Sequence, residues 1–254
     1  LEAWAAMGVK FLPCRSIGYD HIPQQKAKEL GMRISHSWYP PAGVADYAIM
    51  LMLMCNRKVG QILRRADAQD YSLNGKMGRD ITRMTVGVIG TGNIGRTVLR
   101  HLSGFGCKLL AYDLYPNDEA RQYAEYVDLD TLLAQSDVVF LHCNLTADNE
   151  KMINKASIAK MKDGAILINN SRGQLIDEQD VTDALKAGKL AAAGLDVVYT
   201  EPIRADNPLL TAPNCIITPH MSWGAKEARQ RIMDCTADNI RAYLDGAPIH
   251  VVNP

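Results

Sequence analysis

The sequence predicts an α/β fold with a doubly wound parallel sheet and a second, smaller domain. Short runs that are apolar at nearly every position recur along the chain, as is typical of parallel strands covered on both faces. Segments of helical period separate these runs, and a glycine-rich turn follows the run at 86–89. Strands that alternate with helices through short connections favour parallel pairing with right-handed crossovers.

The predicted helices follow from apolar spacing and from capping residues. Residues 94–105 carry one apolar face after the first strand. Asp130 is predicted to cap a helix over 131–135, and a helix over 178–187 is predicted to end at Gly188. The predicted strands span residues 86–89, 108–112, 138–141, 165–168, 193–197 and 215–218.

Two flanks lie outside this series of strands and helices. A helix-like segment at 22–30 precedes a strand-like segment at 32–34, which together indicate a small βαβ fragment. Residues 43–68 form a long helical stretch with a break expected near Gly60. A C-terminal helix is predicted over 226–244.

The chain of 254 residues is long enough for two modest domains. We expect the sheet domain to span residues 43–224. Residues 1–42 and 225–254 are predicted to form the second domain together.

Composition argues against several kinds of partner. Lys+Arg and Asp+Glu both number 28, so no net charge favours nucleic acid or an anionic membrane. The longest apolar run, residues 48–55, is too short to cross a bilayer. The six cysteines form no CxxC pair and no cluster with histidine, so no metal site is expected. Reduced thiols in a cytoplasmic protein are the expected state.

The segment from Gly90 to Gly95 fits the pattern GxGxxG between a strand and an amphipathic helix. Gly90 permits a tight turn, Gly92 lets the backbone approach a pyrophosphate, and Gly95 lets the helix pack closely on the strand. The amides of Asn93 and Ile94 begin that helix, whose N-terminus favours phosphate charge. This context predicts a dinucleotide site.

The next predicted strand ends at Asp113. A carboxylate there accepts hydrogen bonds from the adenosine ribose hydroxyls and repels a 2′-phosphate. Leu114 and Tyr115 follow it, so no arginine stands there to receive that phosphate. The sequence therefore favours NAD over NADP.

Three charged or titratable residues follow the ends of later strands: Arg172, Glu201 and His220. Ligands bind at that edge of a doubly wound sheet. Taken singly, each residue has an ordinary reading as a surface charge or a turn residue. Their joint occurrence at the strand ends predicts a catalytic group. The remaining histidines show no such setting and are interpreted as structural or solvated.

Motifs along the whole chain resemble the NAD-dependent D-2-hydroxyacid dehydrogenase family, in that family's order. The resemblance implies a Rossmann NAD-binding domain and a flavodoxin-like substrate domain. The segments that carry it are residues 15–20, 44–47 and 86–96, Asn170-Ser171-Arg172-Gly173, Asp196 with Glu201-Pro202, and Thr218-Pro219-His220.

The resemblance implies hydride transfer between NAD(H) and a small 2-oxo acid or D-2-hydroxy acid. His220 would act as general acid, and Glu201 would pair with its imidazole and orient it. Arg172 would hold the substrate carboxylate and carbonyl through its planar fork. The backbone of Ile17 and Gly18 would also bind that carboxylate.

The resemblance also implies a set of cofactor contacts. Asp196 would lie near the nicotinamide amide, and Asn93 and Ile94 would contact the pyrophosphate. The complete expected set is Gly90, Gly92, Asn93, Ile94, Gly95, Asp113, Cys143, Asn144, Asn149, Asn170, Ser171, Arg172, Asp196 and His220.

The chain departs from this family in two respects. It begins late, so the substrate domain is expected to lack about its first two βα units. Cys143-Asn144 stands where many relatives carry an apolar residue followed by proline.

The sequence is compatible with two branches of the family and with a second function. Residues 221–224 resemble the hydroxypyruvate and glycerate branch, whereas residues 46–55 and 84–96 resemble D-lactate dehydrogenases. A non-catalytic NAD(H) sensor on the same fold, of the corepressor type, is the alternative function. The family also suggests a homodimer formed through the cofactor domains.

Overall fold

The computed structural model describes residues 1–253, and the chain divides into two compact units. The larger unit is Pro41–Ser222, and the smaller unit joins Leu1–Pro40 to the segment from Trp223 onward. The sequence predicts boundaries after residues 42 and 224, each two residues beyond the boundary that the structure gives after residues 40 and 222.

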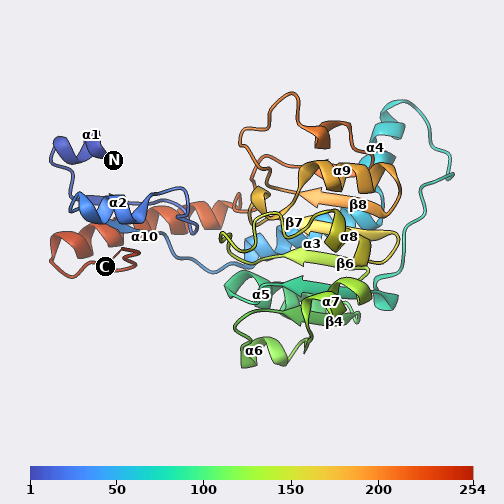
Figure 1. The fold of residues 1–254 in the computed structure, drawn as a ribbon, viewed down its shortest axis with the longest axis horizontal. Coiled ribbons are helices and arrows are strands. Elements are labelled where there is room, and N and C mark those ends of the chain that lie inside the picture. Colours follow the sequence, from blue (N-terminus) through green and yellow to red (C-terminus); the bar gives the residue numbers. More distant parts are fainter. Residues whose placement is uncertain (254) are drawn as a thin grey trace. The chain divides into compact units, whose positions relative to one another are not determined.

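The larger unit is built on a seven-stranded sheet in the order β5-β4-β3-β6-β7-β8-β9 (Figure 1). All of its strand pairs are parallel, which confirms the predicted doubly wound parallel sheet. Since β6 returns to the other side of β3, the direction of winding reverses between these two strands. The strands are β3 (Thr85–Ile89), β4 (Lys108–Tyr112), β5 (Glu125–Tyr126), β6 (Val138–Leu141), β7 (Ala165–Asn169), β8 (Leu190–Leu195) and β9 (Cys215–Ile217).

Helices cover both faces of this sheet (Figure 1). Val138 and Phe140 of β6 pack with α3 and α5, whereas Val139 and Leu141 pack with α7, α8 and α9. Both sides of the central strands β3, β6 and β7 are therefore buried, which explains their continuous apolar runs. The helices are α3 (Ala42–Asn56), α4 (Val59–Asp67), α5 (Asn93–Ser103), α6 (Asp118–Arg121), α7 (Leu129–Gln135), α8 (Lys155–Lys160) and α9 (Glu178–Lys186), with 3-10 turns η1 (Ile81–Arg83), η2 (Gly173–Leu175) and η3 (Pro208–Thr211).

The smaller unit pairs two short parallel strands with the end of the chain. Met32 and Ile34 are buried against α2, and Val251 forms an antiparallel bridge with Ser35. The side chain of Asn253 accepts a hydrogen bond from the Ile34 amide at 2.7 Å. Its elements are α1 (Glu2–Ala6), β1 (Phe11–Pro13), α2 (Gln24–Glu29), β2 (Arg33–Ser35) and α10 (Lys226–Leu244), the last with the predicted bounds.

The structure corrects the predicted cap of α7. Asp128, not Asp130, stands before the first helical residue and accepts a hydrogen bond from the Thr131 amide at 2.9 Å. Asp130 lies inside the first turn, where its carboxylate pairs with Lys160 at 2.7 Å. A capping side chain must precede the helix to reach the free amides, and Asp130 is too far along the chain to do so.

One predicted strand lies earlier in the structure, and the predicted helical break is located. β8 begins at Leu190 and ends at Leu195, earlier than the predicted 193–197, because the chain turns away at Asp196. The helical break expected near Gly60 lies two residues before it, at Lys58, which has a left-handed φ of 54°. Elements of two to six residues such as β5, α6 and α8 were not predicted, since so few residues show no periodicity.

Within residues 1–253, no helix combines the length and apolarity needed to span a bilayer.

Asp137 ties three segments together at the amino-terminal edge of the sheet. Its buried carboxylate accepts hydrogen bonds from the Thr85 amide at 2.8 Å and from Arg79 at 2.9 Å, and it lies 3.2 Å from the Lys162 ammonium. Burial raises the pKa of this carboxyl group, but the hydrogen bonds from Thr85, Arg79 and Lys162 outweigh it, so the net pKa is lowered.

We predict that Asp137→Asn lowers the free energy of unfolding by about 1–3 kcal/mol at neutral pH, since charged hydrogen bonds are lost. Because the folded-state pKa lies below its usual value of 3.8, this stabilisation is present above that pH and is lost as pH falls through the folded pKa. Urea unfolding at pH 7 and at lower pH measures the effect. Asp163→Asn, which removes an exposed partner of Lys189, is the control with little expected change. An equal loss in both variants would contradict the prediction.

Candidate active site

The predicted site residues of the larger unit follow the carboxyl ends of its strands. Because the sheet is parallel, these ends share one edge. Ile17 and Gly18 belong to the smaller unit, where they lie between β1 and α2. At the sheet edge stand Gly90 after β3, Asp113 after β4, Cys143 after β6, Asn170 to Arg172 after β7, Asp196 after β8, and His220 after β9, with Glu201 in the loop between β8 and η3.

The glycine-rich loop has the close contacts that its sequence predicts. A Cβ on Gly90, whose φ is +91°, would lie 2.4 Å from the Cys143 amide, and a Cβ on Gly95 would lie 1.9 Å from the Gly90 carbonyl oxygen. At Gly92 an added Cβ would meet nothing within 4 Å. Gly92 and Asn93 are exposed at the start of α5, so their amides are open to a phosphate. The loop therefore fits a dinucleotide pyrophosphate.

Asp113 is held beside this loop by backbone amides. Its Oδ2 accepts a hydrogen bond from the Thr91 amide at 2.5 Å, and its Oδ1 accepts one from the Tyr115 amide at 2.8 Å. Leu114 and Tyr115 are exposed beyond it. The carboxylate is thus fixed next to the phosphate loop, which is where a ribose hydroxyl acceptor is required.

The structure adds three polar side chains that sequence reasoning missed: Thr91, Asn117 and Tyr126. The buried Thr91 hydroxyl donates to Asp113 at 3.0 Å and accepts from Tyr126 at 2.7 Å. Asn117 donates to the Thr91 carbonyl at 2.8 Å. These residues come from different elements, and only the pairing of β5 with β4 brings them together, so no local pattern could reveal them.

His220 and Glu201 form the pair that the sequence predicts. The imidazole Nδ1 lies 2.8 Å from Glu201 Oε2, and the two side chains are 45% and 39% exposed. The other carboxylate oxygen of Glu201 accepts from the Val198 amide at 3.3 Å. Within residues 1–253 no hydrogen bond engages Nε2 of His220, so that nitrogen is available to a bound molecule.

The turn that carries His220 closes around Asp196. His220 has a left-handed φ of 54°, and its amide donates to the Asp196 carbonyl at 2.8 Å. The fully buried Asp196 carboxylate accepts from the Thr218 hydroxyl at 2.5 Å, from the amides of Met221 at 2.8 Å and Ser222 at 2.7 Å, and from the Ser222 hydroxyl at 2.6 Å. These bonds use the acceptor capacity of both oxygens. The expected contact of Asp196 with a nicotinamide amide stays a prediction.

The loop after β7 positions Arg172. Asn169 accepts from the Ser171 amide at 3.0 Å and donates to the Arg172 carbonyl at 2.9 Å, which closes the turn. A Cβ on Gly173 would lie 2.0 Å from the Val198 carbonyl carbon, so only glycine fits there. Arg172 Nη1 donates to the Ser171 carbonyl at 2.7 Å, which fixes part of the guanidinium.

The side chains of Asn170 and Ser171 bond to the protein itself. Ser171 donates to the Leu141 carbonyl at 2.6 Å, which links the loops after β6 and β7. Asn170 is buried and donates to the Val44 carbonyl at 3.2 Å, while its Oδ1 has no hydrogen-bond partner among the described residues. Their predicted cofactor contacts remain predictions.

The loop after β6 is stabilised by Asn149. Its amide group donates to the Asn144 carbonyl at 2.8 Å and accepts from the Thr146 amide at 2.8 Å. Burial raises the pKa of the Cys143 thiol to about 11, so this thiol is protonated at neutral pH. Burial also lowers the pKa of the neighbouring His142 to about 3 and keeps its imidazole neutral. The sequence interpretation of His142 as a structural residue agrees with this environment.

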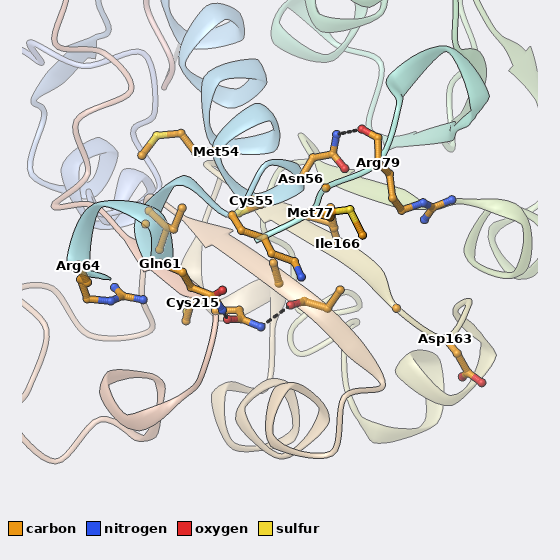
Figure 2. Close-up of a pocket in the computed structure, with 18 residues that line it drawn as sticks. Met54, Cys55, Asn56, Gln61, Arg64, Met77, Arg79, Asp163, Ile166 and Cys215 are labelled. Carbon is orange, nitrogen blue, oxygen red and sulfur yellow. Dashed lines mark hydrogen bonds between the residues drawn. The ribbon is translucent and has the colours of Figure 1, made fainter. Parts of the chain in front are cut away.

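A cavity of about 340 Å³ lies in the larger unit at the opposite edge of the sheet (Figure 2). It is lined by residues at the amino ends of three strands, including Ile166 of β7, Ala191 of β8 and Cys215 of β9. Parallel strands place these positions away from the edge that holds His220. The cavity is therefore separate from the candidate active site. Burial raises the pKa of Cys215 to about 12, so its thiol is uncharged there.

Within residues 1–253, no group of His, Cys, Asp and Glu side chains is arranged to hold a metal ion.

Comparison with known proteins gives a consistent set of relatives. Residues 49–222 match the model of the D-isomer specific 2-hydroxyacid dehydrogenase, NAD binding domain. The chain is 45% identical to the hydroxypyruvate reductase of Blautia hydrogenotrophica over 258 residues, which cover 96% of this chain and 79% of that protein.

Solved structures of the same kind are similar to the whole chain. The apo-structure of D-lactate dehydrogenase from Escherichia coli has a TM-score of 0.89 at 37% identity, covering 99% of this chain and 80% of that chain. D-lactate dehydrogenase from Aquifex aeolicus complexed with NAD and lactic acid has a TM-score of 0.90 at 32% identity, covering 100% of this chain and 83% of that chain. The glycine-rich loop and the family match together show that the cofactor is NAD. The chain belongs to the D-isomer specific 2-hydroxyacid dehydrogenase family.

Proposed function

We propose that Arg172, Glu201 and His220 catalyse hydride transfer between NAD(H) and a small 2-oxo acid or D-2-hydroxy acid. The observation that carries this proposal is the His220–Glu201 pair, 2.8 Å apart, at the same sheet edge as the glycine-rich loop. A protein that only senses NAD(H) has no need of an oriented proton donor beside the cofactor site.

His220 supplies the proton that reduction requires. When NADH is bound, it supplies a hydride to the carbonyl carbon of the 2-oxo acid. The carbonyl oxygen then needs a proton, and Nε2 of His220 donates it. Glu201 accepts the hydrogen of Nδ1, which fixes the tautomer and the ring orientation and leaves Nε2 facing the substrate. Oxidation of the hydroxy acid uses the same nitrogen as a base.

Arg172 binds the substrate carboxylate. A planar guanidinium matches a carboxylate through two parallel hydrogen bonds, which orients the neighbouring carbonyl for reduction. The contact of Nη1 with the Ser171 carbonyl restrains the guanidinium. Ile17 and Gly18 are proposed to bind the same carboxylate through their amides.

Asp113 is proposed to select NAD(H) over NADP(H). Its carboxylate is fixed beside the glycine-rich loop by the Thr91 and Tyr115 amides. A ribose hydroxyl can donate to that carboxylate, whereas a 2′-phosphate would be repelled by it. The remaining predicted cofactor contacts, including Asn93, Asn149 and Asp196, are part of the same proposal.

The proposed substrates are lactate, glycerate with hydroxypyruvate, and glyoxylate. Two relatives, a hydroxypyruvate reductase at 45% identity and a D-lactate dehydrogenase at 38% identity, support this class of small acids. We also propose that residues 1–42 and 225–254 form the substrate domain and residues 43–224 the cofactor domain.

The proposal predicts that His220→Ala lowers kcat by roughly 10²–10⁴-fold while the Kd for NADH stays near the wild-type value. NADH absorbance with glyoxylate, hydroxypyruvate, pyruvate and longer 2-oxo acids measures turnover, and calorimetry measures cofactor binding. His101→Ala, which removes an imidazole paired with Asp46 away from this edge, is the matched control and should keep its kcat. A wild-type chain that binds NADH but reduces none of these acids would instead support the sensor function.

We further propose a homodimer formed through the larger unit. Leu63, Tyr71, Leu73 and Met77 are 56%, 71%, 83% and 84% exposed, and they lie in α4 and the loop after it, among charged residues such as Arg65 and Asp70. Several large, exposed apolar side chains within one short stretch of chain favour an interface over a solvated surface.

Leu73→Asp combined with Met77→Glu should therefore convert the dimer to a monomer, because two charges would be buried at the interface. Sedimentation velocity measures the change. Leu244→Asp, at an exposed position that ends α10 in the smaller unit, should leave the dimer intact. A wild-type chain that sediments as a monomer would exclude the proposed interface.

A cytoplasmic location is also proposed, since all six cysteines are free thiols. Alkylation of the isolated protein, denatured without a reductant, should label every cysteine. Incomplete labelling would indicate disulfides and an oxidising compartment.

A further inference from the structure

A chain of hydrogen bonds leads from the edge of the sheet to Asp113. The Asn117 amide donates to the Tyr126 hydroxyl at 3.2 Å, and this hydroxyl donates to Thr91 Oγ1 at 2.7 Å. Thr91 Oγ1 donates in turn to Asp113 Oδ2 at 3.0 Å. We call these three side chains, Tyr126, Thr91 and Asp113, the ribose relay.

The direction of the relay follows from donor capacity. A hydroxyl group has one hydrogen to donate, and a carboxylate only accepts. Thr91 Oγ1 receives hydrogens from Tyr126 at 2.7 Å and from Asn117 Nδ2 at 3.2 Å. Its own hydrogen is therefore committed to Asp113. Thr91 is fully buried, so water does not compete for this bond.

The two carboxylate oxygens of Asp113 accept different numbers of hydrogen bonds. Oδ2 accepts two hydrogen bonds, both from Thr91, whereas Oδ1 accepts one from the Tyr115 amide. Each carboxylate oxygen has two lone pairs. The remaining acceptor site is thus on Oδ1, and the bonds to Oδ2 prevent the carboxylate from rotating that site away.

Asn117 anchors the relay to the surrounding fold. Its Oδ1 accepts from the Ala120 amide at 2.9 Å and caps α6, while its Nδ2 donates to the Thr91 carbonyl at 2.8 Å. The ring of Tyr126 also lies 4.8 Å from the Arg121 guanidinium. Tyr126 and Thr91 are therefore held by α6 independently of any bound cofactor.

We propose that Thr91 and Tyr126 are positioning residues that set cofactor choice by holding the Asp113 carboxylate toward the adenosine ribose. The inference rests on the proposed role of Asp113. Neither residue contacts the ribose directly, and both act through the carboxylate. A fixed carboxylate accepts a hydrogen bond from a ribose hydroxyl and repels a 2′-phosphate. In a mobile carboxylate both the hydrogen bond and the repulsion are weaker.

Binding of NADH and NADPH, measured by calorimetry on the full chain, tests the relay without requiring turnover. Tyr126→Phe keeps the ring but removes the donor, and Thr91→Val keeps the shape but removes the hydroxyl. Each should raise the Kd for NADH roughly three- to ten-fold and should lower the preference for NADH over NADPH. Thr91→Ser, which retains the hydroxyl, should stay near wild type.

The double variant distinguishes a relay from two separate effects. Because both residues act on one carboxylate oxygen, the combined change in the Kd for NADH should be smaller than the product of the single changes. Tyr243→Phe in the smaller unit, whose ring stacks on Phe11 at 4.3 Å, is the matched control and should leave both Kd values unchanged.

A purely structural role gives a different result. If Tyr126→Phe and Thr91→Val lower the melting temperature but leave both Kd values at wild type, the proposal is overturned. Asp113→Ala separates this failure from failure of the proposed role of Asp113. If Asp113→Ala weakens NADH and strengthens NADPH binding while the relay variants do not, only the relay is wrong. If Asp113→Ala also changes neither Kd, the role of Asp113 itself is wrong.

Discussion

The buried carboxylate of Asp196 is the constraint on which the geometry of the catalytic edge depends. An ionised carboxylate is costly to remove from water unless hydrogen bonds replace its hydration. The Thr218 hydroxyl and the backbone and hydroxyl groups of the next turn supply those bonds, while the Asp196 carbonyl accepts from the His220 amide. This turn holds the backbone of His220 in its left-handed conformation. The position of the imidazole therefore depends on the hydrogen bonds that satisfy the buried Asp196.

The loops at the carboxyl edge of the sheet pack against one another through close backbone contacts. Gly173 lies against the Val198 carbonyl, and Gly90 lies against the Cys143 amide, so neighbouring loops leave no room for a side chain. The Ser171 hydroxyl links the loops after β6 and β7 in the same way. Such loops resist displacement, and the candidate catalytic groups are therefore held in place before any ligand binds.

Local pattern predicts most of the larger unit but not its polar networks. Apolar runs predict the central strands because both of their faces are covered, and the bounds of α10 follow from helical periodicity sustained over 19 residues. Local pattern predicts the cap of α7 at Asp130, two residues after the observed cap Asp128, since the pattern identifies a capping residue type and not its exact position. Arg172, Glu201 and His220 could be found from their places after strands. Thr91 and Tyr126 could not, because only the pairing of β5 with β4 brings them together.

The larger unit is a continuous segment of the chain, whereas the smaller unit is made of two separated segments, which affects the order in which the units can fold during synthesis. The larger unit is one continuous stretch, so all of its strands have left the ribosome before the final helix does. The smaller unit combines segments from both sides of the larger unit, and the second edge of β2 is paired only when Val251 bridges Ser35 and Asn253 bonds to Ile34. Until then β2 presents unpaired backbone groups, as an edge strand does. A nascent chain therefore completes the larger unit while one edge of β2 is still unpaired, and β2 gains its second partner only after residues 251–253 have been made.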